Sequence, residues 1–144
     1  MLVKIIAVGK IKDRNLLAKC EDYSRRISHD AKLEIVEIRD SNTETEGDKL
    51  LGHIKEEKRF VFALGEEGKQ YNSRQFAQRI ESSGRRAVFL IGGPEGLSDS
   101  AKKGAGEVLS LSSMTLTHEL ARMFLLEQIY RAISIMHNRK YHRD

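Results

Sequence analysis

The stretch Ala87-Val88-Phe89-Leu90-Ile91-Gly92-Gly93-Pro94-Glu95-Gly96-Leu97 decides the fold, because an apolar run leads directly into three glycines and the only proline of the chain. An apolar run bounded by Gly and Pro is typical of a buried strand. Glycine lacks a Cβ, so its backbone can approach a ligand closely. Open α/β sheets bind ligands at the carboxyl ends of their strands, which makes residues 92–96 a candidate ligand loop. Gly-Gly-Pro is also an ordinary turn, and the spacing alone favours neither interpretation.

This loop does not carry a known phosphate-binding signature. Its glycines are not spaced as G-x-G-x-x-G, the dinucleotide pattern. Gly68-Lys69 resembles the end of a P-loop, but Ala63 stands at the position of the first glycine and Gln70 at that of the magnesium-binding Ser or Thr. The sequence therefore disfavours ATP or GTP chemistry.

Strand and helix patterns alternate along the chain. Apolar runs predict strands at 2–8, 33–38, 60–64, 87–91 and 108–111. Helical spacing and caps predict helices over 16–27, 48–57, 73–83, 98–103 and 117–137, with a loop at 40–47 and a turn at 65–68. This order indicates an α/β fold with a mostly parallel sheet and helices on both faces. At 144 residues, we expect a single domain spanning 1–144.

Composition narrows the setting of the protein. Lys and Arg outnumber Asp and Glu by 25 to 21, and several of the cations cluster near the C-terminus. Such clustering favours RNA or another polyanion as partner, although a basic surface is often merely solvated. The single cysteine, Cys20, occupies an apolar helix position, so a core role is favoured over a nucleophile. With no apolar run long enough to span a membrane and no leader pattern, we expect a cytoplasmic protein without a membrane partner.

The last predicted helix is apolar around nearly its whole circumference. One sheet face cannot cover such a helix, so we expect another subunit, that is, a homodimer. Arg122 falls among apolar positions of this helix, where an unpaired charge is costly. Its partner is expected to be a carboxylate or an anionic substrate; a snorkelling side chain is the simpler alternative.

Metal chemistry has little support in the sequence. His118-Glu119-Leu120-Ala121-Arg122 approaches the zinc pattern H-E-x-x-H but carries Arg at the second ligand position, so we expect no metal. The C-terminal residues Tyr141, His142 and Arg143 combine groups that can stack, move a proton and hold an anion. From the residues alone, a frayed and solvated chain end is the favoured interpretation.

Taken together, several motifs resemble the ribosomal RNA large subunit methyltransferase H family of SPOUT-class RNA methyltransferases. The resemblance is carried by the 91–97 loop, the segment Leu109-Ser110-Leu111-Ser112-Ser113-Met114-Thr115-Leu116-Thr117-His118, the step Tyr130-Arg131-Ala132 and the terminal Tyr141-His142-Arg143. It extends over nearly the whole chain, including the opening residues 3–10.

The resemblance implies a C-terminal trefoil knot and a homodimer. It also implies a transferase in rRNA processing that uses S-adenosyl-L-methionine as methyl donor. The expected substrate is N3 of a pseudouridine in 23S ribosomal RNA on assembled ribosomes. Carried over residue by residue, it implies a cofactor pocket formed by Leu64, Gly92, Gly93, Gly96, Leu111, Ser112, Ser113, Met114, Thr115 and Leu116. His142, Arg143 and Tyr141 would then be catalytic, and Arg122, Arg139 and Lys140 are candidate RNA contacts. In this interpretation the C-terminal tail completes the pocket of the partner subunit.

Three positions depart from the family pattern. Thr117 and Lys140 stand where the family usually has proline, and Glu119 after His118 is atypical. Two alternatives therefore stay open: a dimer of the same fold that binds RNA or the ribosome without transferring methyl groups, and a methyltransferase of the same class that acts on another RNA.

Overall fold

The computed structural model describes residues 1–144 and contains one five-stranded sheet in which every pairing is parallel. The spatial order of the strands is β2-β1-β4-β3-β5. Their bounds are β1 (Leu2–Val8), β2 (Lys32–Ile38), β3 (Val61–Gln70), β4 (Arg86–Ile91) and β5 (Glu107–Ser110). The predicted parallel sheet is confirmed.

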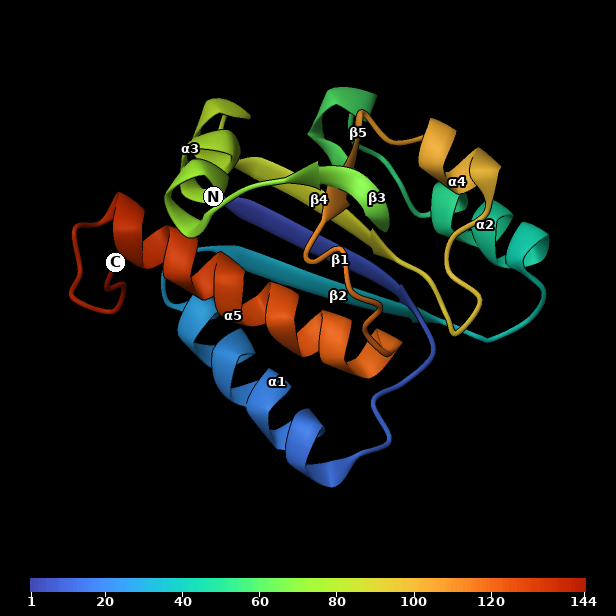
Figure 1. The fold of residues 1–144 in the computed structure, drawn as a ribbon, viewed down its shortest axis with the longest axis horizontal. Helices are drawn as coiled ribbons and strands as arrows, with labels where there is room; N and C mark the ends of the chain where they lie inside the picture. Colours follow the sequence, from blue (N-terminus) through green and yellow to red (C-terminus); the bar gives the residue numbers. More distant parts are fainter.

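Helices cover both faces of the sheet, also as predicted. One face carries α1 (Arg14–Ser28), α3 (Ser73–Ser82) and α5 (His118–Met136), and the other carries α2 (Thr43–Gly52) and α4 (Asp99–Lys103), as Figure 1 shows. A short 3-10 helix, η1 (Lys58–Phe60), precedes β3. None of the helices combines the length and the hydrophobicity that crossing a membrane requires.

Side-chain alternation along the strands divides the core into two clusters. Phe89 of β4 belongs to the cluster under α1, α3 and α5, whereas the next residue, Leu90, belongs to the cluster under α2 and α4. Successive side chains of a strand point to opposite faces, so an apolar strand such as β4 serves both clusters at once.

The predicted loop at 40–47 is wrong in its second half. Helix α2 begins at Thr43, because the Asn42 side chain accepts a 2.8 Å hydrogen bond from the backbone N–H of Thr45 and so caps the helix. The helix also ends earlier than predicted, at Gly52. The buried side chain of Glu46 accepts a 2.8 Å hydrogen bond from the N–H of Ser41, which fixes this turn against the preceding chain.

The predicted turn at 65–68 is wrong as well, because β3 continues through it to Gln70. Strand β5 pairs with β3 on both sides of an irregularity between Leu64 and Lys69. Gly68 allows the close approach, since a Cβ at this position would lie 2.5 Å from the carbonyl oxygen of Val108. Helix α3 is capped by Asn72 rather than by Ser73. The other predicted elements agree to within one or two residues.

Candidate functional site

A cavity of about 420 Å³ opens at the carboxyl end of β4, where the sequence predicted a ligand loop, and beside residues 64–67 in the middle of β3. It lies between that loop, the segment after β5 and the first turn of α5. Nine of the ten predicted cofactor residues line it: Leu64, Gly92, Gly93, Gly96, Leu111, Ser112, Met114, Thr115 and Leu116. Ser113 is the one that does not.

The glycines of the 92–97 loop are required by the loop itself. A Cβ on Gly92 would lie 2.5 Å from the carbonyl carbon of Gly96, and Gly96 has a φ of +77°. The N–H of Gly96 donates a 2.9 Å hydrogen bond to the carbonyl of Gly93, closing a tight turn. The segment is therefore a turn, and this turn forms one wall of the cavity.

Local hydrogen bonds shape the opposite wall. The Ser110 hydroxyl donates to the carbonyl of Ser112 (2.9 Å), and the Ser112 hydroxyl accepts from the N–H of Met114 (3.0 Å). Met114 is 76% exposed, so an apolar side chain stands in solvent at the edge of the cavity. This wall therefore combines fixed backbone polar groups with apolar side chains.

An ion pair between two elements lies at the same cavity and was not predicted. The Lys102 ammonium of α4 is 2.8 Å from a carboxylate oxygen of Glu67 in β3, and both residues line the cavity. The hydrogen bond from Lys102 lowers the pKa of Glu67. Gly65 makes room for this carboxylate, because a Cβ there would lie 2.9 Å from both of its oxygens. His118 and Ala121 of α5 also line the cavity.

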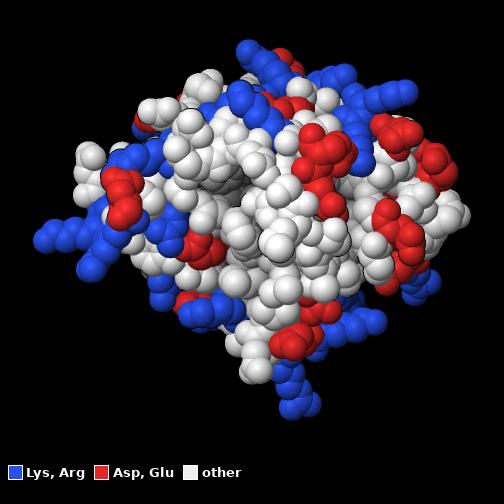
Figure 2. Space-filling model, in the orientation of Figure 1, with Lys and Arg blue, Asp and Glu red and all other residues white.

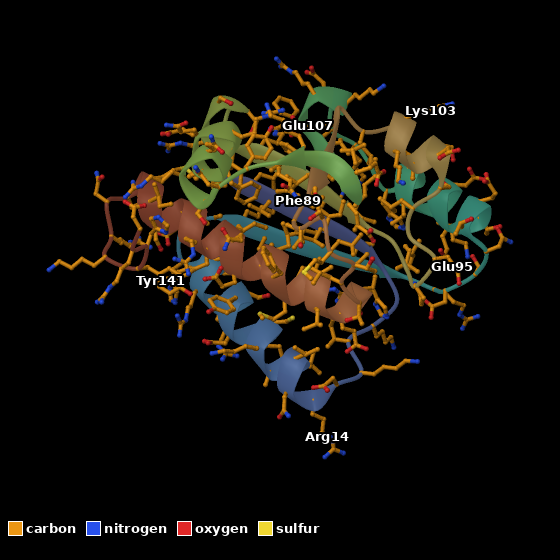
Figure 3. The ribbon with its side chains drawn as sticks, viewed as in Figure 1. Arg14, Phe89, Glu95, Lys103, Glu107 and Tyr141 are labelled. Atoms are coloured by element: carbon orange, nitrogen blue, oxygen red, sulfur yellow. The ribbon has the colours of Figure 1, made fainter.

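The predicted catalytic residues lie at the other end of the molecule. Tyr141 follows the C-terminal end of α5, whereas the cavity adjoins its N-terminal end, and Figure 3 shows Tyr141 and Glu95 of the loop on opposite sides. A helix of 19 residues is about 28 Å long. The structure therefore does not bring Tyr141, His142 and Arg143 to the cavity of their own chain.

The tail is ordered by a network of polar contacts. The Tyr141 hydroxyl donates to Glu127 (3.0 Å) and lies 2.9 Å from the Tyr23 hydroxyl; its burial and these contacts raise its pKa. His142 contacts Arg131 through Nδ1 (3.1 Å) and Asp144 through Nε2 (2.9 Å). The frayed tail expected from the residues alone is thus wrong for Tyr141 and His142.

The candidate RNA contacts differ in their accessibility. Arg122 is only 4% exposed; its guanidinium pairs with Glu37 and donates to the carbonyl of Gly9 (2.8 Å). Arg122 is therefore internal. Its partner is the carboxylate of Glu37, one of the two kinds of partner that the sequence predicted. Arg139 is exposed and forms an ion pair with Asp30 (2.6 Å). Lys140 and Arg143 are exposed and form no ion pair.

Comparison with known proteins identifies the family. The family model described as "Predicted SPOUT methyltransferase" matches residues 1–142. A protein of Natranaerobius thermophilus named "Ribosomal RNA large subunit methyltransferase H" is 41% identical, and the match covers 99% of each chain. The chain belongs to the ribosomal RNA large subunit methyltransferase H family of SPOUT methyltransferases. Proteins of the same name from Caldicellulosiruptor bescii and Enterococcus faecalis are 37% and 35% identical, over 99% of this chain and 100% of theirs.

A solved structure shares the SPOUT fold. The SpoU methyltransferase AviRb from Streptomyces viridochromogenes, in complex with the cofactor AdoMet, superposes with a TM-score of 0.50 at 11% identity. The superposition covers 89% of this chain and 56% of that one. The likeness supports the arrangement of the sheet and its helices.

Two of the three departures from the family pattern have clear structural roles in this SPOUT methyltransferase. The Thr117 hydroxyl caps α5 by accepting from the N–H of Leu120 (3.2 Å). The Glu119 carboxylate accepts from the N–H groups of Lys12 and Asp13 (3.1 and 3.0 Å), which fastens the chain before α1 to the start of α5. The wall of the cavity is therefore anchored at Thr117 without a proline.

No group of three or more His, Cys, Asp and Glu side chains is arranged to hold a metal ion.

Proposed function

We propose that this protein methylates N3 of a pseudouridine in 23S ribosomal RNA, with S-adenosyl-L-methionine as the methyl donor and the assembled ribosome as substrate. The observation that carries the proposal is the cavity between residues 92–97 and 111–116, in a chain that matches large subunit methyltransferases over 99% of its length. The AdoMet complex of AviRb supports the choice of cofactor.

The residues of the cavity fit this cofactor. The volume of 420 Å³ lies in the range of small-molecule sites. Leu64, Ile91 and Leu116 offer apolar walls for an adenine ring, and the backbone of 111–116 offers polar groups at close range. A sulfonium group supplies an electrophilic methyl carbon, so transfer requires alignment with the attacking nitrogen.

The proton on N3 of the pseudouridine has to leave before or during the attack, which calls for a base or a nearby cation. We assign this task to the tail, with His142 accepting the proton or orienting the base and Arg143 stabilising negative charge, while Tyr141 packs the tail. Both ring nitrogens of His142 are engaged within the chain, so the assignment requires Asp144 or Arg131 to give up its contact.

The position of the tail supports a dimer as the catalytic unit. Because α5 separates the tail from its own cavity, the tail reaches a cavity only in a second subunit. Three of the five exposed large apolar residues, Leu17, Leu120 and Phe124, lie on α1 and α5, which pack against each other. Figure 2 shows few charges over the N-terminal half of α5, which suits burial against a second copy. We therefore propose a homodimer.

The remaining expectations follow from the same assignment. We propose that the C-terminal part of the chain forms the trefoil knot of its family, that residues 1–144 act as one domain, and that the protein works in the cytoplasm, where ribosomes are assembled. The RNA is then contacted by Arg139, Lys140 and Arg143, with Arg122 in a structural role.

Transfer of labelled methyl groups from S-adenosyl-L-methionine tests the proposal. The substrates are ribosomes that lack the modification, naked ribosomal RNA and transfer RNA, followed by mapping of the modified nucleotide. Label at a large-subunit pseudouridine in ribosomes alone is the expected result. Label in another RNA would overturn the substrate assignment, and absence of both label and cofactor binding would identify a dimer without transfer activity.

A further inference from the structure

A second cavity lies at the end of the sheet opposite the cofactor pocket. It measures about 320 Å³ and is lined by Arg59, Phe60, Arg79, Ser82, Ser83 and Gly84. These residues belong to η1, which precedes β3, and to the last turn of α3 with the two residues after it, which precede β4. The two cavities are separated by the length of β4, on the order of 15–20 Å.

Exposed cations surround this second cavity. Lys58, Arg59, Arg85 and Arg86 are all exposed, and Figure 2 shows Lys and Arg atoms along the upper margin, around the position of η1. Lys58 and Arg86 form no ion pair. Arg59 and Arg85 pair with Glu57 and Glu81 at 2.9 and 3.8 Å, but all four side chains are more than half exposed, so these pairs contribute little and yield readily to a polyanion.

An aromatic side chain organises two of these cations. The guanidinium carbons of Arg59 and Arg86 lie 4.6 and 5.7 Å from the ring centroid of Phe60. Cation–π contact restricts the guanidinium groups and leaves their N–H groups available at the ring edge. Arg79, the other cation at the cavity, pairs with Glu107 at 3.2 Å and is not free to bind an anion.

The backbone at this surface is held in an uncommon conformation. Arg85 has a φ of +61°, in the left-handed region that non-glycine residues rarely adopt, directly after Gly84 at +74°. The carbonyl of Arg85 accepts from the N–H of Leu2 (2.9 Å), which fixes the turn at the start of β1. This turn leads directly into Arg86, whose guanidinium lies over Phe60 of η1, while Arg85 pairs with Glu81 at the end of α3.

We infer that Lys58, Arg59, Arg85 and Arg86, with the guanidinium groups of Arg59 and Arg86 held over Phe60, form a second RNA-binding surface that binds the phosphate backbone of the ribosomal RNA away from the methylated nucleotide. The inference rests on the proposed function. Positively charged, exposed guanidinium groups fit phosphates, and contacts to phosphate position an RNA without reading its sequence. An RNA that contacts both ends of the sheet has to reach across the roughly 15–20 Å between the two cavities, so this surface adds affinity only for an RNA that extends beyond the methylated nucleotide.

The double variant R59Q/R86Q tests the inference, with K49Q/K103Q as the matched control, because Lys49 and Lys103 are exposed cations on α2 and α4. Ribosome binding is measured by co-sedimentation at several salt concentrations, together with KM and kcat for methyl transfer. We expect R59Q/R86Q to raise KM for ribosomes about 10-fold and to reduce the salt dependence of binding by about two counterions. The control variant K49Q/K103Q should bind and methylate ribosomes as the wild type does. In R59Q/R86Q, kcat and the affinity for S-adenosyl-L-methionine should stay unchanged.

Several outcomes would overturn this inference. One is equal behaviour of the two double variants; another is a fall in kcat or cofactor affinity in R59Q/R86Q, which would indicate a structural effect. Loss of binding to ribosomes with unchanged binding to naked ribosomal RNA would indicate a protein partner instead. Co-sedimentation can be read even when the wild-type protein transfers no methyl group, so failure of the proposed function is distinguished from failure of this inference.

Discussion

At the scale of single residues, Arg122 has the largest predicted effect on stability. Replacing it with Met leaves the Glu37 carboxylate and the Gly9 carbonyl without their partner. Breaking a buried ion pair costs about 3–5 kcal/mol, and since Glu37 is 34% exposed and can be hydrated, we expect a loss of about 2–3 kcal/mol. Urea denaturation measures this loss. Arg25→Met, at a side chain 70% exposed, is the control and should change stability by less than about 0.5 kcal/mol; equal midpoints would contradict the role of Arg122.

Tyr71 gives a prediction for high pH. Burial and a 2.5 Å hydrogen bond to Glu107 raise its pKa to about 12. Because the folded pKa exceeds the unfolded value, the stability that Tyr71 contributes is complete below about pH 10 and is lost as the pH rises through about 12. The difference in absorbance at 295 nm between the wild type and Tyr71→Phe should therefore titrate near pH 12. A midpoint near pH 10 would contradict both the burial of the Tyr71 hydroxyl and its contact with Glu107.

At the scale of elements, helix α5 joins the cavity and the C-terminal tail, which lie at its opposite ends. Its first turn borders the cavity and its last turn leads to the tail, so a complete site is expected to combine the cavity of one subunit with the tail of another. We therefore expect His142→Ala and Gly92→Val each to abolish methyl transfer, the latter by closing on Gly96. After subunit exchange in an equal mixture, half of the dimers contain one subunit of each variant. Each mixed dimer has one intact site, formed by the cavity of the His142→Ala subunit and the tail of the Gly92→Val subunit. About a quarter of the wild-type activity should therefore return.

The control for this mixture is His142→Ala exchanged with itself, which should remain inactive. Absence of recovery, after exchange has been verified with tagged subunits, would mean that the tail serves its own subunit or has no part in the reaction.

The elements also show what the sequence can and cannot predict. The strand at 87–91 and its glycine loop were predictable because apolar residues, glycines and proline act locally there. The course of β3 through Gly65 and Gly68 was not, because pairing with β5 overrides the local turn preference. The Glu67–Lys102 pair joins segments 35 positions apart, and the place of Tyr141 depends on how α5 packs. No local pattern indicates either of them.

At the scale of the whole molecule, the proposed dimer can be broken at one position. Phe124 is 37% exposed on α5, so an aspartate there is tolerated by the isolated chain but not by an apolar interface. We expect Phe124→Asp to be a folded monomer by light scattering, with methyl transfer abolished, and Phe124→Leu to remain an active dimer. A dimeric Phe124→Asp protein would place the interface elsewhere.

The strand order has a consequence for the synthesis of the protein. Strand β1 lies between β2 and β4, and its residue Leu2 pairs with Arg86, which is translated much later. At elongation rates of 5–20 residues per second, the nascent β1 waits roughly 4–17 s for this neighbour. During that interval one edge of a strongly apolar strand is open to other nascent chains, so chaperone binding early in translation is expected to decide how much protein folds.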